Sequence, residues 1–362
     1  MKHEKYMQLA LELAEKGKGK TSPNPMVGAV VVKNGRILAT GYHKKFGGPH
    51  AEATALKACG NKAKGATLYI NLEPCCHFGK TAPCTDLIIR SGIKKVVCAT
   101  IDHNPKVNGK GIKSLKKNGI NVNLGVLEKE AKKLNEVYFK YITTKLPFVM
   151  LEVVQTLDGR IIQQTESSKS KGSRISSQLI RFVKPGIDAV LCDANTGGTD
   201  YLKPFLDSDN SSNPKLILVG TWREISSKLR KIRKDLHKNI VLVPTDLESV
   251  ERKKQNKFRM WRIKKRRNGE IDLVSLLKKA GEDGITSLLI DGGTRIATSF
   301  LKQRLVDKIW YFISPDMLGK GEEPFGDLGT KRISDSVILK NSEYKQFKDG
   351  LLVVGYPAEV GS

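Results

Sequence analysis

The stretch from residue 49 to residue 84 constrains the fold of this chain most, because it contains a His-x-Glu followed by a Pro-Cys and a further cysteine. It begins Pro-His-Ala-Glu, continues to Pro-Cys-Cys and ends at a further Pro-Cys. One imidazole and two thiolates give Zn²⁺ three protein ligands and leave a fourth tetrahedral position for water, as in catalytic zinc sites. We therefore expect His50, Cys75 and Cys84 to bind zinc and Glu52 to be the catalytic acid and base.

Local patterns place these residues on an α/β framework. A helix over 50–59 has His50 near its start, and a strand over 67–72 ends shortly before Cys75. Asn34-Gly35 predicts a two-residue hairpin. We expect further strands at 27–32, 36–42, 95–100 and 122–125, and helices at 1–15, 83–90, 111–117 and 127–142. This alternation predicts a sheet with helices on both faces.

The length of 362 residues favours two domains, with the boundary in the linker around Pro147, so that they span 1–145 and 146–362. In the second half, the strand 286–291 leads through Gly292-Gly293-Thr294 into a helix, a pattern that suits anion binding by backbone N–H groups. The other elements expected there are strands at 148–155, 188–193, 215–219, 239–244, 307–313 and 350–356, helices at 176–183, 273–280 and 295–303, and a Ser/Lys-rich loop at 167–173.

The formal net charge of +26 is compatible with nucleic acid, an acidic surface or a phosphorylated metabolite as partner. The lysines are scattered along the whole chain, which favours a solvated surface over a nucleic-acid-binding one. The densest basic run, residues 252–267, is expected to be an exposed strand-loop-strand insertion. The charge therefore gives little reason to expect a nucleic-acid partner.

Cysteine usage and hydropathy bear on the compartment. Four of the six cysteines lie between residues 59 and 84, which suits a reducing compartment and metal binding better than a disulfide framework. The first residues lack the apolar segment of a signal peptide, and no apolar run approaches membrane-spanning length. We expect a cytoplasmic protein with no membrane partner and, because two small domains expose many helices, a homo-oligomer.

Other polar residues are candidates for substrate contact. His77 and Lys80 lie between the two zinc-binding cysteines, and we favour substrate contact over a merely exposed loop. Asn24 and the segment 102–105 lie in turn-rich loops, where a binding role and ordinary turn chemistry are both open. The glycines at 109 and 111 lack the third glycine of a dinucleotide fingerprint. We interpret the remaining cysteines, Cys59, Cys76, Cys98 and Cys192, as structural.

Four motifs closely resemble the bifunctional riboflavin-biosynthesis deaminase/reductase family: Pro-His-Ala-Glu, Leu-Glu-Pro-Cys, His-x-Gly-Lys-Thr-x-Pro-Cys and Asn-Pro-Lys-Val-x-Gly-Lys-Gly. The resemblance implies a cytidine-deaminase-like α/β/α domain at residues 1–145, with one zinc ion, and a dihydrofolate-reductase-like α/β domain at residues 146–362. It implies that the first domain deaminates a diaminohydroxypyrimidine with a phosphoribosylamino group. The second would then reduce the ribosyl part to ribityl with NADPH.

The same resemblance implies the site residues beyond zinc and Glu52. In the first domain, the substrate contacts would be Asn24, His43, His77, Lys80, Asp102 and Asn104. In the second domain, Asp291 would contact substrate, and the cofactor contacts would be Val154, Thr196, Asp200, Thr221, Gly292, Gly293, Thr294 and Arg295.

The second domain departs from the family pattern. Glu152 stands where the family has Lys, Asp291 shortens a Glu, and residues 171–176 replace an expected Trp-Ile-Thr. These changes would weaken substrate binding more than cofactor binding, so one alternative is a deaminase with a degenerate reductase domain. A nucleic-acid base deaminase would instead favour Cys-x-x-Cys and stacking aromatic residues. A nucleic-acid-binding protein with structural zinc would need a fourth ligand.

Overall fold

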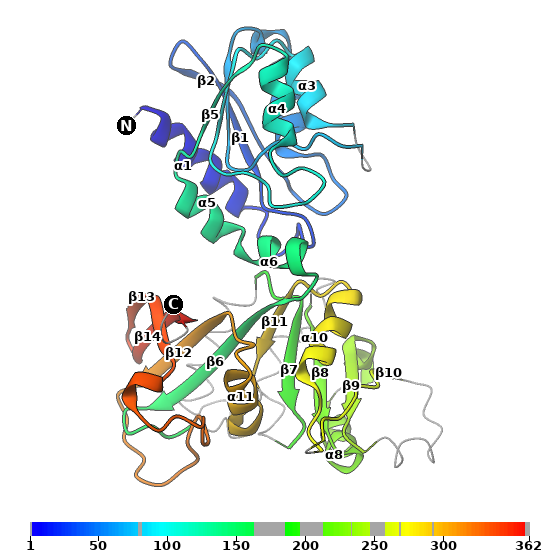
Figure 1. The fold of residues 1–362 in the computed structure, drawn as a ribbon, viewed down its shortest axis with the longest axis vertical. Coiled ribbons are helices and arrows are strands. Elements are labelled where there is room, and N and C mark those ends of the chain that lie inside the picture. The colour runs from blue at the N-terminus through cyan, green and yellow to red at the C-terminus, as the bar shows by residue number, and fades with distance from the viewer. Residues whose placement is uncertain are drawn as a thin grey trace. The chain divides into compact units, whose positions relative to one another are not determined.

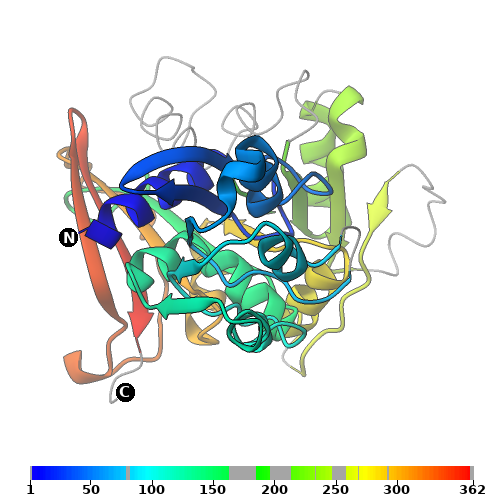
Figure 2. The same cartoon turned by 90° about the horizontal axis from the view of Figure 1, so that it is seen from above.

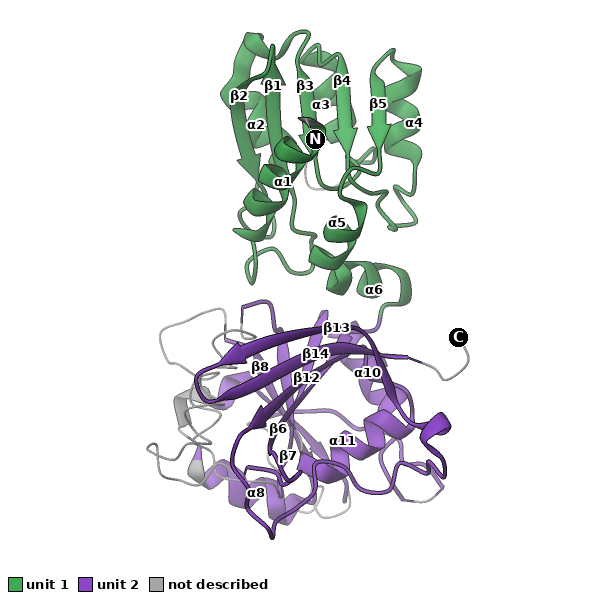
Figure 3. Ribbon diagram, turned by 90° about the vertical axis from the view of Figure 1, so that its left-hand side faces the viewer, with its two compact units in different colours: residues 1–145 green, residues 146–362 purple. Residues whose placement is uncertain are grey.

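The computed structural model describes residues 2–78, 82–162, 185–195, 213–232, 234–246, 258–267, 269–291 and 293–358. The chain divides into two compact units, Met1–Lys145 (unit 1) and Leu146–Ser362 (unit 2), which are coloured separately in Figure 3. Each unit is built around a sheet of its own. No helix in the described ranges is long and apolar enough to cross a membrane.

Unit 1 contains a five-stranded sheet in the order β2-β1-β3-β4-β5 (Figure 3). The predicted hairpin is confirmed: β1 and β2 pair antiparallel, and Asn34 and Gly35 have φ angles of 51° and 76°. A two-residue hairpin turn of the type that matches strand twist requires such positive angles. Strands β3, β4 and β5 pair in parallel. The strands are β1 (Gly28–Lys33), β2 (Arg36–Tyr42), β3 (Thr67–Ile70), β4 (Lys95–Cys98) and β5 (Asn121–Leu124).

Helices cover both faces of this sheet, as the alternating pattern predicted. Apolar residues of α2, α3 and α4 pack in one cluster with β1, β3 and β4, while those of α1 and α5 pack in another with the opposite side chains of the same strands. The helices of unit 1 are α1 (Lys2–Glu15), α2 (Ala51–Cys59), α3 (Cys84–Arg90), α4 (Lys110–Lys117), α5 (Glu128–Leu134) and α6 (Glu136–Thr144).

The single helix predicted over 127–142 is wrong, because the chain breaks between α5 and α6 at Asn135. Asn135 has φ −108° and ψ 21°, and its buried side chain pairs with the backbone of Met26. Its Oδ1 accepts from the Met26 N–H at 2.8 Å and its Nδ2 donates to the Met26 carbonyl at 3.0 Å. Asparagine side chains compete with helix hydrogen bonds in this way. Helices α5 and α6 are therefore separate elements.

Unit 2 contains a nine-stranded sheet in the order β10-β9-β8-β7-β11-β6-β12-β14-β13. Figure 2 shows the β13–β14 hairpin at one edge, in red and orange, and β10 at the other. The strands pair in parallel from β10 to β12, and β14 and β13 add antiparallel. The strands are β6 (Phe148–Thr156), β7 (Ala189–Asp193), β8 (Lys215–Gly220), β9 (Ile240–Pro244), β10 (Arg259–Met260), β11 (Ser287–Ile290), β12 (Lys308–Ser314), β13 (Ile338–Phe347) and β14 (Gly350–Ala358).

Three described helices accompany this sheet (Figure 1). Helices α10 (Leu273–Glu282) and α11 (Gly293–Lys302) bury Leu276 and Phe300 against one face, and α8 (Trp222–Lys231) packs on β8 and β9. The sequence analysis did not predict α8 or β13. The predicted helix 176–183 and the Ser/Lys-rich loop lie outside the described residues.

The expectation that residues 252–267 form an exposed strand-containing insertion is wrong in part: in residues 258–267 the basic side chains are exposed, but two apolar side chains are buried. Strand β10 extends the sheet beside β9, and Trp261 and Ile263 are buried in the main core of unit 2. The Trp261 Nε1 donates to the Asp283 carboxylate at 2.8 Å. The indole can be buried with its N–H satisfied in this basic segment, because the basic side chains between the apolar ones remain exposed to water.

Candidate active site

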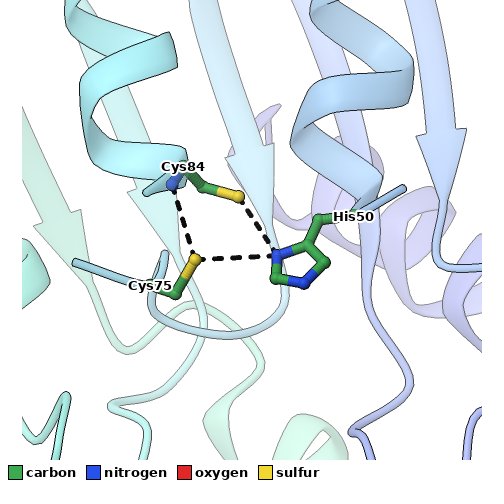
Figure 4. Close-up of side chains that lie close together, drawn as sticks. All are labelled: His50, Cys75 and Cys84. Carbon is green, nitrogen blue, oxygen red and sulfur yellow. Dashed lines mark hydrogen bonds between the residues drawn. The ribbon is translucent and has the colours of Figure 1, made fainter. Parts of the chain in front are cut away.

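The three predicted zinc ligands converge from three elements of unit 1 (Figure 4). His50 is the N-cap of α2, Cys84 is the first residue of α3, and Cys75 lies in the loop that follows β3. The His50 Nδ1 is 3.2 Å from the Cys84 Sγ and 3.6 Å from the Cys75 Sγ. All three donor atoms lie within 4.8 Å of one another. The pattern in the sequence therefore corresponds to one cluster in space.

This cluster fits zinc. Two donors at zinc bond lengths of about 2.0 to 2.3 Å and a tetrahedral angle are separated by roughly 3.6 Å, close to the distances between His50 and the two sulfurs. Cys76 points elsewhere, with its Sγ 3.9 Å from the Lys106 carbonyl oxygen. Three converging ligands and a spare cysteine that turns away are the arrangement of an open, catalytic site.

Electrostatics within the cluster favour a bound cation. The hydrogen bond with Cys84 lowers the pKa of Cys75, and the same interaction raises the pKa of Cys84. The hydrogen bond to Cys75 raises the pKa of His50. Without a metal, the three side chains share protons through these hydrogen bonds. A divalent cation would displace those protons, because zinc binds thiolates and neutral imidazole.

Glu52 lies in the first turn of α2, two residues after His50. It is 3% exposed and lines the same cavity as His50 and Cys75. Burial raises the pKa of Glu52, and the neighbouring Cys75 raises it further. The carboxyl is therefore suited to holding a proton next to the metal-binding cluster.

The cavity in front of the cluster has a volume of about 340 Å³ and lies within unit 1. It brings together most of the predicted substrate contacts of the first domain. Its lining includes Asn24, His43, His77, Asp102 and Asn104. Lys80 lies outside the described residues.

His43 contacts its neighbours through both ring nitrogens. Its Nδ1 is 3.0 Å from the Pro49 carbonyl oxygen, which accepts only from a protonated nitrogen, so the neutral ring presents an acceptor at Nε2. The Asn24 Nδ2 donates to this Nε2 at 3.2 Å. Burial lowers the pKa of His43, in agreement with the neutral form. The amide of Asn24 is thereby held with its Oδ1 turned away from His43.

Asp102 is a buried acid that also lines the cavity. Its carboxylate accepts from the Tyr138 hydroxyl at 3.0 and 3.1 Å, and its Oδ1 accepts from the Asn104 N–H at 2.8 Å. Burial raises the pKa of Asp102, while these hydrogen bonds lower it. Tyr138, Tyr141 and Ile142 reach the cavity from α6. The sequence analysis missed them, because no motif connects this helix to the zinc-binding residues.

In unit 2, the predicted cofactor residues lie on several elements. Thr221 caps α8, where its hydroxyl accepts from the Glu224 N–H at 3.4 Å. Gly293 and Thr294 begin α11, and the Thr294 hydroxyl donates to the Glu323 carbonyl. The Arg295 guanidinium donates to the buried Asp193 carboxylate at 2.8 and 3.0 Å. Val154 lies in β6 in a small apolar cluster. Thr196, Asp200 and Gly292 lie outside the described residues.

Two acids approach each other in the middle of the unit 2 sheet. Leu151 of β6 pairs with Ile290 of β11; Glu152 is the next residue of β6, and Asp291 directly follows the end of β11. Burial raises the pKa of both carboxyls. The Glu152 Oε1 is buried and has no hydrogen-bond partner among the described residues. The departure from the family pattern at Glu152 thus lies directly beside Asp291.

Comparison with known proteins agrees with this geometry. Residues 1–100 match the sequence model of the cytidine and deoxycytidylate deaminase zinc-binding region, and residues 147–353 match that of the RibD C-terminal domain. The riboflavin biosynthesis protein RibD of Aquifex aeolicus is 42% identical over 96% of both chains. This chain belongs to the RibD family. It is an enzyme of riboflavin biosynthesis with a zinc-binding deaminase domain followed by a reductase domain.

Solved RibD structures confirm the two-domain α/β fold that the sequence predicted. The diaminohydroxyphosphoribosylaminopyrimidine deaminase/5-amino-6-(5-phosphoribosylamino)uracil reductase of Thermotoga maritima is 34% identical, with a TM-score of 0.80 and 99% of both chains covered. Acinetobacter baumannii RibD is 28% identical, with a TM-score of 0.78 and the same coverage. The predicted family resemblance is also confirmed, and it extends over nearly the whole chain.

Proposed function

We propose that unit 1 hydrolytically deaminates the diaminohydroxyphosphoribosylaminopyrimidine named for the Thermotoga relative. His50, Cys75 and Cys84 would hold one zinc ion, which when bound makes a water molecule acidic enough to act as hydroxide near neutral pH. The observation that supports this assignment most is the convergence of the three donors beside buried Glu52 at one cavity.

In this proposal Glu52 moves the protons. It accepts a proton from the attacking water and delivers it to the pyrimidine ring and the departing amine, so that ammonia leaves and a carbonyl replaces the amino group. Its burial next to Cys75 favours the protonated state in which it must act as an acid. The position of Glu52 in the first turn of α2 holds its carboxyl beside His50.

The cavity residues would orient the substrate. Asn24, fixed by His43, offers an amide oxygen to an N–H or hydroxyl donor, and Asp102 offers a carboxylate to amino or ring N–H donors. His77, Asn104 and Lys80 complete the set that we propose for the pyrimidine and its phosphate-bearing arm. The high positive charge of the chain would favour such an anionic substrate.

The test of the deaminase assignment is Glu52→Gln, which keeps the shape of the side chain and removes its proton chemistry. Zinc should remain at one per chain while ammonia release falls by roughly 10²- to 10⁴-fold, the usual contribution of a general acid and base. Glu128→Gln, on the exposed part of α5, is the matched control. Undiminished turnover in Glu52→Gln would contradict the assignment.

For unit 2 we propose NADPH-dependent reduction of the ribosyl group to ribityl. Hydride would add to C1 of the ribosyl group, the carbon bonded to the amino nitrogen of the pyrimidine, as the bond from C1 to the ring oxygen of the sugar breaks. A proton would go to that oxygen, which becomes a hydroxyl of the open-chain polyol. The start of α11 at Gly293 and Thr294, after the end of β11, supports a phosphate-binding role, because N-terminal N–H groups of a helix attract anions. Asp291 would contact the substrate, and Val154, Thr196, Asp200, Thr221, Gly292 and Arg295 would complete the cofactor site.

Spectroscopy of the nicotinamide tests this second proposal. The full chain, given the deaminated intermediate, should oxidise NADPH faster than NADH, with loss of absorbance of the reduced nicotinamide. A flat trace from folded, NADPH-binding protein would instead support the alternative, a deaminase with a degenerate reductase domain. The observation that favours this alternative is the buried acid Glu152.

We further propose a cytoplasmic homo-oligomer that acts on a small phosphorylated pyrimidine and not on nucleic acid. All six cysteines are free thiols, which suits a reducing compartment. Light scattering would measure the oligomeric state. A salt-sensitive gel shift with RNA or single-stranded DNA at micromolar concentrations would contradict the absence of a nucleic-acid partner.

A further inference from the structure

One buried carboxylate connects the loop that carries Cys75 to another segment that lines the cavity of unit 1. Glu73 follows β3 and precedes Cys75 by two residues, and it is 3% exposed. Its Oε2 accepts from the backbone N–H groups of Asp102 at 3.1 Å and Gly109 at 2.9 Å, and its Oε1 accepts from that of Ile112 at 3.1 Å. All three donors belong to residues 102–112, here called the 102–112 segment.

The 102–112 segment supplies one wall of the cavity. It begins at Asp102, includes Asn104 and ends in the first turn of α4. The segment packs directly on the chain between Glu73 and Cys75, because a Cβ at Gly111 would lie 2.2 Å from the Pro74 carbonyl oxygen. The position of Asp102 therefore depends on contacts with the two residues that precede the metal-binding cysteine.

We propose that Glu73 is a positioning residue for deamination, whose carboxylate fixes Asp102 relative to Cys75. A carboxylate is required because all three partners are N–H donors, and an amide in its place would direct its own N–H₂ group at one of them. The single residue between Glu73 and Cys75 leaves little freedom for the two to move apart. This inference rests on the proposed roles of Cys75 as a zinc ligand and of Asp102 as a substrate contact.

The experiment compares Glu73→Gln with the parent in the full chain, with zinc content, kcat and KM measured from ammonia release. Zinc should stay at one per chain, since its ligands are unchanged. KM should rise roughly ten- to a hundredfold with a much smaller change in kcat, because loss of a hydrogen bond to a charged group is of that size. Zinc loss, or a KM equal to that of the parent, would overturn the inference.

Two further variants separate positioning from general destabilisation. Met7→Ala creates a cavity in the α1 core, away from the 102–112 segment, and should lower Tm without raising KM. In the double variant Glu73→Gln/Asp102→Asn, KM should rise by less than the product of the two single effects, as expected for residues that act through one another. Independent, multiplicative effects would overturn the inference.

The controls also distinguish failure of this inference from failure of the proposed function. A parent protein that binds no zinc or releases no ammonia would contradict the proposed function itself. If Glu73→Gln does not fold, Glu73→Asp replaces it. The shorter carboxylate would draw the 102–112 segment, and Asp102 with it, out of its normal position and should also raise KM. An unchanged KM in that folded variant overturns the inference as well.

Discussion

Glu152 gives a prediction about the pH dependence of unit 2. Burial, together with the nearby Asp291, raises the pKa of Glu152 from 4.5 to about 8. The folded protein then binds a proton that the unfolded chain has released between these two values. The contribution of Glu152 to the stability of unit 2 is therefore most favourable at low pH and declines as pH rises through this window.

The size of the effect follows from the pKa shift. Each pKa unit corresponds to about 1.36 kcal/mol, so the shift from 4.5 to about 8 makes an ionised Glu152 destabilise unit 2 by roughly 5 kcal/mol at pH 9. Glu152→Gln removes the ionisation and keeps the shape. We expect its Tm to exceed that of the parent by roughly 10–20 °C at pH 9, since 1 kcal/mol is about 2–4 °C for a domain of this size. At pH 5 the two proteins should differ little.

Differential scanning calorimetry of the full chain at pH 5 and pH 9 measures this difference. Glu322→Gln, at an exposed position of the same unit, is the control and should leave Tm unchanged at both pH values. A Tm difference between Glu152→Gln and the parent that is the same at pH 5 and pH 9 would refute the reasoning, because the carboxyl would then not be held neutral in the fold.

Three further predictions concern unit 1. Tyr138→Phe removes the hydroxyl that donates to buried Asp102, so the free energy of unfolding in urea should fall by about 1.5–3 kcal/mol. Gly111→Ala drives a Cβ into the Pro74 carbonyl and should lower Tm in a thermal melt, whereas Lys113→Ala, exposed on the same helix, should not. Cys84→Ser removes one of the three proposed zinc ligands, so atomic spectroscopy should find well under one zinc per chain while circular dichroism stays close to that of the parent.

The zinc-binding cluster was predictable from the sequence because its geometry is local. His50 and Glu52 share the first turn of one helix, and Cys75 and Cys84 flank a short loop between a strand and a helix. Helix and strand periodicity is enough to orient such residues. The roles of these residues remain predictions until the variants are measured.

The contribution of α6 to the cavity was not predictable, because contacts between distant residues determine where this helix lies. The course of α6 depends on the pairing of Asn135 with Met26, 109 residues earlier in the chain. Periodicity alone favoured one continuous helix there. Strand β13 was missed for a different reason: most of its side chains are exposed on both faces, so the apolar and polar residues do not alternate.

The pairing of Asn135 with Met26 also determines when the cavity can form during synthesis. The three candidate zinc ligands are all present once residue 84 has been made, but the residues that line the cavity from α6 come more than fifty positions later. In the nascent chain the candidate metal site is therefore complete in sequence before the part of the cavity lining that α6 supplies.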